Sequence, residues 1–181
     1  MLKPNGAAEL TAFTEKSYKE TITPIVPGIW HVLGVGHSNA VIIEGRTSVI
    51  LVDTLDTLER GQKLLEIIRS RTEKPVKTIL YTHGHPDHRG GAGAFSGTDP
   101  EIIAFAPATP VLKKTEMLQD IQTLRGIRQF GYALGDEENI SQGIGIREGL
   151  AYGESRAFRQ PTTVYDEDKV VREIDGVRLE L

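Results

Sequence analysis

Residues 82–91 read Thr-His-Gly-His-Pro-Asp-His-Arg-Gly-Gly and follow directly on an apolar run with strand-like composition. Three of the five histidines of the chain lie in this stretch, together with an aspartate. Side chains alternate along an extended segment, so His83 and His85 point to the same side and can bind one metal ion together. The proline that follows turns the chain, which sends Asp87 and His88 in another direction, where they can bind a second ion.

The residue types in this motif favour a metal site over ordinary packing. Imidazole and carboxylate groups are the ligands that zinc accepts in open, catalytic sites. A single histidine usually has a structural explanation, but packing gives no reason for an H-x-H-x-D-H cluster. The sequence therefore predicts a metal site made of His83, His85, Asp87 and His88, with two Zn²⁺ ions when complete. Iron and manganese stay open because the same ligands accept them.

The residues before the motif alternate between predicted strands and a helix. Apolar, strand-like segments occupy Gly28–Leu33, Ser38–Gly45 and Ser48–Thr54. Asp56–Glu59 then has the pattern of a capping box, with a side-chain acceptor at the start and an acid three residues later. Apolar residues recur on one face after it, which predicts an amphipathic helix that ends near Thr72.

The residues after the motif continue the alternation. We expect a short helix from Gly90, packed tightly against the sheet, and a buried strand at Glu101–Phe105. Thr109-Pro110 is a typical helix start. The apolar residues that follow at helical spacing, interpreted as core packing, are Met117, Ile121 and Leu124, flanked by Leu118 and Ile127.

A hairpin is predicted at the end of the chain. Val170–Ile174 and Val177–Leu179 flank Asp175-Gly176, a dipeptide that favours tight turns between antiparallel strands.

Composition places the chain among ordinary globular proteins. Its 181 residues predict one domain over residues 23–181, preceded by a polar, extended arm over residues 1–22. There is no cysteine, so disulfides and thiolate ligands are excluded. The net charge of −4 gives no reason to expect nucleic acid as a partner.

No segment has the apolar length of a membrane span, and the first residues lack the pattern of a signal peptide. The cytoplasm is therefore the default expectation, and a periplasmic or secreted location would require a leader that is missing from this sequence.

A second group of residues is a candidate for anion binding. Arg125 and Arg128 are three residues apart, Tyr132 follows, and a glycine-rich segment covers residues 142–149. The planar guanidinium group suits tetrahedral oxyanions, and glycine lets backbone N–H groups approach them. The alternative is a solvated helix face followed by turns. Acids in this part of the chain, such as Glu148, are interpreted as solvated surface rather than as additional metal ligands.

The H-x-H-x-D-H motif and the strands before it resemble the metallo-β-lactamase superfamily. The resemblance implies an α/β fold, a four-layer αββα sandwich with the metals at one edge, of which this chain has the first half to two-thirds. It also implies that Asp53, at the end of the third of these strands, supports the metal ligands without binding the metal. The alternative for Asp53 is a carboxylate at a helix N-terminus.

Within the superfamily, the sequence is most similar to the alkyl and aryl sulfatases. Arg89–Ala92, the arginine-containing helix and the segments at Leu150 and Pro161-Thr162 carry this resemblance. It implies a dinuclear zinc hydrolase in which metal-bound hydroxide cleaves a small-molecule sulfate ester. Asp87 would orient the hydroxide, and Arg125, Arg128 and Tyr132 would bind the sulfate group.

One departure from the superfamily pattern affects this interpretation. No histidine follows His88, whereas superfamily members complete their sites with ligands from the second half of the sandwich. We therefore expect a chain that is truncated at its C-terminal end and that exposes apolar surface, so that homo-oligomers or aggregates form. The alternative functions are a non-catalytic fragment of the fold, or a hydrolase of lactones, thioesters or β-lactams, because a fold does not determine the substrate.

Overall fold

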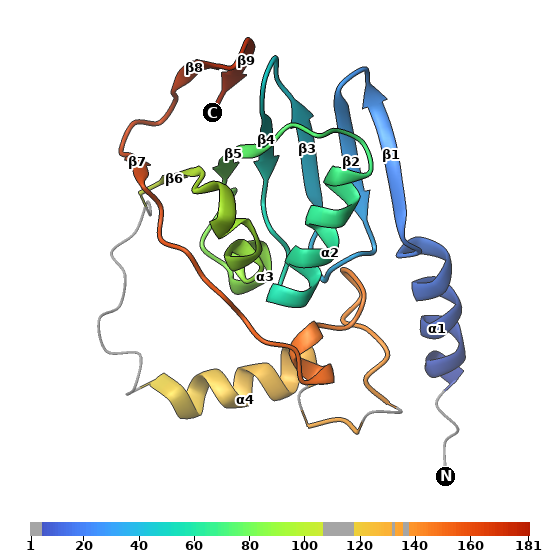
Figure 1. Cartoon of the computed structure of the whole chain (residues 1–181). Coiled ribbons are helices and arrows are strands. Elements are labelled where there is room, and N and C mark those ends of the chain that lie inside the picture. The colour runs from blue at the N-terminus through green and yellow to red at the C-terminus, as the bar shows by residue number, and fades with distance from the viewer. Residues whose placement is uncertain (1–4, 107–117, 132, 136–137) are drawn as a thin grey trace.

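The computed structural model describes residues 5–106, 118–131, 133–135 and 138–181. Seven strands form one sheet in sequence order, from β1 at one edge to β7 at the other (Figure 1). The pairings from β1 to β4 are antiparallel, and those from β4 to β7 are parallel. The strands are β1 Thr21–Val26, β2 Ile29–Leu33, β3 Ala40–Glu44, β4 Val49–Val52, β5 Val76–Leu80, β6 Glu101–Phe105 and β7 Thr163–Tyr165.

Helical segments connect the parallel strands, as parallel pairing requires. Helix α2 (Leu58–Arg69) joins β4 to β5, while α3 (Pro86–Arg89) and the 3₁₀ helix η1 (Ala92–Thr98) join β5 to β6. The helix α4 (Gln119–Phe130) and the 3₁₀ helix η3 (Gly149–Tyr152) lie between β6 and β7.

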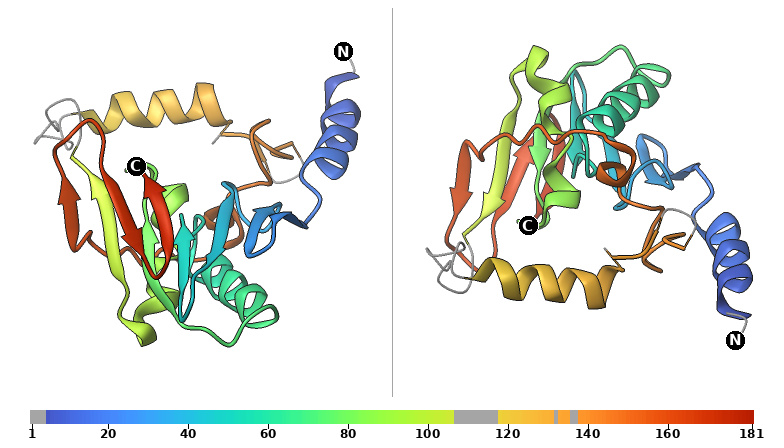
Figure 2. Two further views of the ribbon diagram at one scale, coloured as in Figure 1. Left: turned by 90° about the horizontal axis from the view of Figure 1, so that it is seen from above. Right: turned by 90° about the horizontal axis from the view of Figure 1, so that it is seen from below.

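The sheet has a different cover on each face, which agrees with the predicted layers. Helix α2 and η1 pack on one face, where Leu64, Ile68 and Phe95 join side chains of the sheet in the main core. On the other face, Ile50, Leu80 and Ile103 form a smaller apolar cluster with residues of the C-terminal hairpin. Figure 2 shows α2 and this hairpin on opposite sides of the sheet. The α/β prediction is therefore confirmed.

The hairpin consists of β8 (Val171–Ile174) and β9 (Val177–Glu180), which form a separate two-stranded sheet. Its turn is held by the Asp175 carboxylate, which accepts hydrogen bonds from the backbone N–H groups of Thr47 and Ser48 at 2.8 and 2.7 Å. The prediction of a hairpin around Asp175-Gly176 is confirmed.

The expected extended arm over residues 1–22 is wrong in its conformation. Residues Asn5–Ser17 form the helix α1, and β1 begins at Thr21. The segment contains three alanines and two glutamates, which favour a helix even without an amphipathic stripe. Two contacts hold the helix to a later loop, from Thr14 to Ser141 and from Tyr18 to the carbonyl of Gly143.

The predicted start of α2 is wrong by one residue. The N-cap is Thr57, whose hydroxyl accepts a hydrogen bond from the N–H of Arg60. Asp56 is not the cap, because its carboxylate is fully buried and binds the guanidinium of Arg60 at 3.0 Å. Glu59 does not close a capping box, because it accepts two hydrogen bonds from Ser155 instead.

The prediction that the apolar residues of α4 pack in the core is wrong for those that the structure describes. The exposed fractions of Ile121, Leu124 and Ile127 are 63%, 56% and 38%. Helical periodicity shows that the side chains share a face, but it does not show that another element covers that face. The predicted helix start at Thr109-Pro110 lies outside the described residues, and so does Met117. Among the described residues, none of the helices has the length and apolarity that crossing a membrane requires.

Candidate metal centre

The H-x-H-x-D-H motif lies at the carboxyl end of β5, in the centre of the parallel half of the sheet. β5 ends at Leu80, the loop that follows carries His83 and His85, and α3 carries Asp87 and His88. Ligands bind outside the carboxyl ends of the strands in open α/β sheets. The neighbouring strand β4 contributes Asp53, which follows its last residue.

Glycines allow the backbone after the motif to approach its neighbours closely. A Cβ atom at Gly91 would overlap the carbonyl oxygen of Thr54, and one at Gly61 in α2 would overlap the carbonyl oxygen of Gly91. The expected tight packing after the motif is therefore present, although as the 3₁₀ helix η1. This contact fixes the end of α3 against the start of α2.

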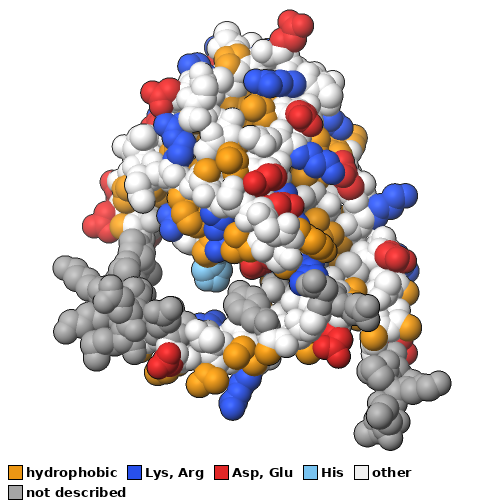
Figure 3. All heavy atoms as spheres, turned by 60° about the horizontal axis from the view of Figure 1, so that its bottom comes forward, with side chains coloured by type: hydrophobic (Ala, Val, Ile, Leu, Met, Phe, Trp, Pro, Cys, Tyr) orange, Lys and Arg blue, Asp and Glu red, His pale blue; other side chains and the backbone are white. Residues whose placement is uncertain are grey.

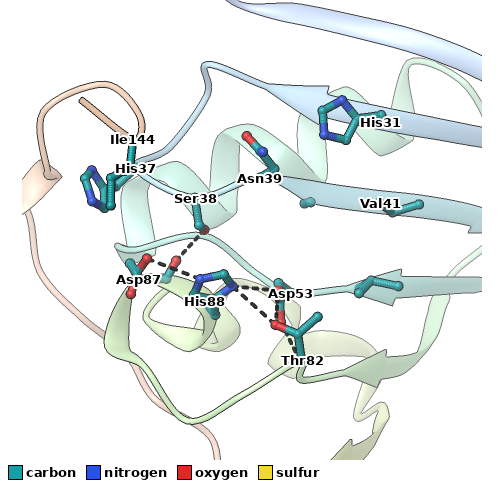
Figure 4. A pocket seen from close by; sticks show the side chains of 12 residues that line it. His31, His37, Ser38, Asn39, Val41, Asp53, Thr82, Asp87, His88 and Ile144 are labelled. Carbon is teal, nitrogen blue, oxygen red and sulfur yellow. Dashed lines mark hydrogen bonds and ion pairs between the residues drawn. The ribbon is translucent and has the colours of Figure 1, made fainter. Parts of the chain in front are cut away.

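Asp53 holds the loop of the motif in place. The residue has a φ of 59°, a strained conformation for a residue other than glycine. Its carboxylate accepts hydrogen bonds from the N–H and hydroxyl of Thr82 at 2.9 and 2.7 Å, and it lies 2.7 Å from Nδ1 of His88. Figure 4 shows this group at the end of the strands. Asp53 therefore fixes the His88 ring, with Nε2 as the nitrogen left to bind another group.

The three imidazoles of the motif are neighbours. The ring centroid of His83 lies 4.6 Å from that of His85 and 4.0 Å from that of His88. Nε2 of His88 lies 3.3 Å from the carboxylate of Asp87. The rings contact one another. In the described parts of the chain, no group of three His, Asp or Glu side chains has the arrangement of a metal site.

The donor set nevertheless fits a divalent cation. His83 and His85 are exposed, so packing does not prevent their rings from turning. Three imidazoles and one carboxylate are borderline and hard ligands of the kind that zinc, iron and manganese accept. The carboxylate of Asp53 on Nδ1 of His88 is the outer-shell partner that metal-binding histidines typically have.

Charge coupling within the motif shifts its pKa values. Burial disfavours the charged form of His88, but hydrogen bonds to Asp53 and Asp87 outweigh it and raise the pKa of His88 to about 9. Burial likewise opposes ionisation of Asp87, and the hydrogen bond to His88 outweighs it and lowers the pKa of Asp87 to about 2. Burial and the two neighbouring imidazoles lower the pKa of His83. In this state, a protonated His88 sits between two carboxylates, a place that suits positive charge.

A cavity of about 330 Å³ borders the motif on the side of β2 and β3 (Figure 4). Asp87 and His88 line it together with His31, Asn39 and further residues of these strands. The hydroxyl of Ser38 donates to the carbonyl of Asp87 at 2.6 Å and so fixes the start of α3. The sequence analysis did not identify this contact, because serine in a loop has no distinctive spacing.

A second cavity, of about 370 Å³, separates the motif from α4. His85, Asp87 and Arg125 line it, so the structure brings one predicted anion-binding residue to the motif. Arg128 is exposed and lies outside this lining, because it is two residues, or about 200° of helix rotation, from the lining residue Gly126. Tyr132 lies outside the described residues.

Two residues of this cavity were missed by the sequence analysis. Glu148, interpreted as solvated surface, and Arg156 both line it. Figure 3 shows the face hollowed between α4 and the body of the chain, with a histidine and basic side chains at the opening. Glu148 and Arg156 follow the last residue of the motif by 60 and 68 residues, so no local pattern connects them with it.

Comparisons with known proteins agree with this geometry. The family model described as the metallo-beta-lactamase superfamily matches residues 33–176. An alkyl/aryl-sulfatase of Saccharomyces cerevisiae is 34% identical over an alignment of 161 residues that covers 84% of this chain and 25% of that protein. A linear primary-alkylsulfatase of Pseudomonas sp. is 31% identical over 146 residues, covering 77% of this chain and 27% of that protein.

A solved structure shares the fold. The inverting sec-alkylsulfatase Pisa1 from Pseudomonas sp. matches with a TM-score of 0.68 and 23% identity, over 89% of this chain and 27% of that chain. The chain thus spans about a quarter of the length of these relatives. The family match covers most of the chain and includes the whole histidine motif, and the chain belongs to the metallo-beta-lactamase superfamily.

Proposed function

We propose that the chain carries the first metal-binding half of a dinuclear zinc hydrolase that cleaves sulfate esters. One observation carries this proposal: His83, His85, Asp87 and His88 gather at the carboxyl end of β5, and Asp53 binds the far nitrogen of His88. The relatives named alkylsulfatases support the substrate class.

Each residue of the motif has a separate role in this proposal. His83 and His85 bind one ion through imidazole nitrogens, and Asp87 and His88 bind the second. Asp53 keeps the proton on Nδ1 of His88, so that Nε2 presents its lone pair to the metal. Ser38 fixes the backbone of Asp87 through its 2.6 Å hydrogen bond, which limits the directions that this carboxylate can take.

Zinc, when bound, supplies a nucleophilic water at neutral pH and polarises an oxygen of the ester. The residues of the chain supply the orientation. Asp87 accepts a hydrogen bond from the attacking water and holds it toward the ester. Arg125 binds oxygens of the sulfate group from the wall formed by α4, and we retain Arg128 and Tyr132 as candidates for the same role. Iron and manganese are the alternative metals.

The test is hydrolysis by the purified chain after loading with Zn²⁺. We would assay p-nitrophenyl sulfate and hexyl sulfate beside a lactone, a thioester and a β-lactam, with His85→Ala as the matched control. Metal-dependent release of sulfate that is absent in His85→Ala would support the proposal. Hydrolysis of one of the other esters or amides alone would replace the substrate class, and metal binding without hydrolysis would favour a non-catalytic role for this chain.

A further inference from the structure

Arg156 is held beside the metal motif by backbone hydrogen bonds on both sides. The carbonyl of the preceding Ser155 accepts from the first residue of α2 at 2.8 Å. The following Ala157 donates to the carbonyl of Gly90 and accepts from the N–H of Gly93, both at 2.7 Å. Gly93 has no room for a side chain, because a Cβ atom there would overlap that of Ala157. The segment of Arg156 is therefore bound directly to the chain that follows the motif.

Arg156 lines the cavity that the motif shares with α4, and it also lines a neighbouring cavity of about 520 Å³ together with Glu148. His85 and Asp87 line this cavity from the motif, Arg125 lines it from α4, and Glu148 and Arg156 complete the polar part of the wall. Basic groups thus approach the cavity from two elements that are separate in the fold.

The guanidinium of Arg156 has a hydrogen-bond donor without an acceptor. Its Nε–H is buried and has no hydrogen-bond partner in the described structure. Its Nη2 lies 3.4 Å from Glu148, which is longer than the 2.7–2.9 Å of a strong charge-assisted hydrogen bond. A buried N–H without a partner is unfavourable and rare in folded proteins. Such a donor beside a cavity indicates a ligand that accepts hydrogen bonds.

We infer that Arg156 binds the anionic group of the substrate, in the cavity that it shares with Arg125. A tetrahedral oxyanion would accept from Arg156 in the two-pronged arrangement that guanidinium favours once the guanidinium turns toward the cavity, because its Nε–H is buried in the ligand-free chain. Glu148 shares the terminal nitrogen in the ligand-free chain and is displaced from it when the anion binds. The identification of the anion as sulfate rests on the proposed function. The existence of an anion site at Arg156 does not depend on it.

The test measures binding of inorganic sulfate to the metal-free chain at constant ionic strength, with chloride as the reference ion. Arg156→Met should weaken sulfate binding about tenfold or more, because it removes charged hydrogen-bond donors. Glu148→Gln should strengthen binding, because it removes the competing carboxylate, and Arg156→Lys should restore part of the lost affinity. The control is Arg69→Met, which removes an exposed basic residue at the end of α2, outside the cavity, and should leave the affinity unchanged.

Two results would overturn the inference: the absence of saturable sulfate binding in the unaltered chain, or equal affinity in the unaltered chain and a folded Arg156→Met variant. If Arg156→Met does not fold, the comparison of Glu148→Gln with the unaltered chain decides, and unchanged affinity overturns the inference. Sulfate binding that follows the predicted order in a chain that neither binds zinc nor hydrolyses sulfate esters would refute the proposed function alone. Hydrolysis with a KM that Arg156→Met leaves unchanged would refute the role of Arg156 alone.

Discussion

Replacing Asp56 by alanine should destabilise the chain more than any substitution of an exposed acid. The Asp56 side chain is fully buried, and its carboxylate accepts hydrogen bonds from the backbone N–H groups of His37 and Gly149 at 3.0 and 2.8 Å. It also binds the guanidinium of Arg60, which is itself 7% exposed. One carboxylate thus connects α2 with the loop of His37 and with the start of η3.

The magnitude follows from these contacts. Removing one partner of a buried ion pair typically costs about 3–5 kcal/mol, because the other charge stays buried without compensation. Glu154 still lies 3.2 Å from Arg60, so we expect the lower part of this range. For a domain of this size, 1 kcal/mol shifts the melting temperature by about 2–4 °C, which predicts a decrease of about 6–12 °C at a cost of about 3 kcal/mol.

Thermal and urea unfolding followed by circular dichroism would measure this effect. The control is Glu73→Ala, which removes an exposed acid and should change stability by less than about 0.5 kcal/mol. Adding Arg60→Met to Asp56→Ala should cost less than the sum of the single substitutions, because both charges of the buried Asp56–Arg60 pair are then removed. A loss below about 1 kcal/mol for Asp56→Ala, or additive losses in the double variant, would refute the reasoning.

Three further predictions concern other parts of the structure. Asp53→Asn should lower zinc affinity about 10–100-fold in a chelator competition assay, because it weakens the hold on His88; unchanged affinity would contradict the role of Asp53. Gly91→Ala should lower the free energy of unfolding by about 1–3 kcal/mol through overlap with Thr54, and a neutral result would show that the backbone can move apart. The backbone N–H of Thr47 and then the hydroxyl of Ser48 lower the pKa of Asp175 to about 2, from 3.8. The stabilisation from Asp175 is therefore present above pH 3.8 and lost as the pH falls toward 2. Urea unfolding across this pH range should show the loss. The free energy of unfolding of Asp175→Asn should depend less on pH over the same range.

The parts of the fold that the sequence predicted well have local causes. The hairpin at Asp175-Gly176 depends on the conformations that two adjacent residues favour, and the structure has it at the expected position. The strands β3, β4 and β6 are mostly apolar, as expected for a sheet that is covered on both faces.

The parts that the sequence did not predict depend on contacts between distant residues. The apolar spacing of Ile121 and Leu124 is that of a buried helix face, yet both side chains are exposed. Asp56 has the chemistry of an N-cap, but its carboxylate is used by Arg60, His37 and Gly149 instead. Local pattern identifies a polar group that needs a partner, but it does not show which partner the fold supplies.

The same distinction applies to the candidate site. The four residues of the motif are close in sequence, so their meeting could be predicted from spacing and strand geometry. Arg156 could not be found in this way, since contacts between distant residues, among them the backbone hydrogen bonds of Ala157 to Gly90 and Gly93, bring its segment to the motif.

The most direct test of the account is the number of zinc ions bound by each chain, measured by native mass spectrometry after loading with Zn²⁺ and removal of excess metal. The account predicts that the chain retains zinc, that His85→Ala retains less because one ion loses a ligand, and that His31→Ala, which alters a histidine outside the motif, retains as much as the unaltered chain. A chain that holds no zinc, or that holds as much with His85→Ala as without it, would contradict the assignment of His83, His85, Asp87 and His88 as a metal centre.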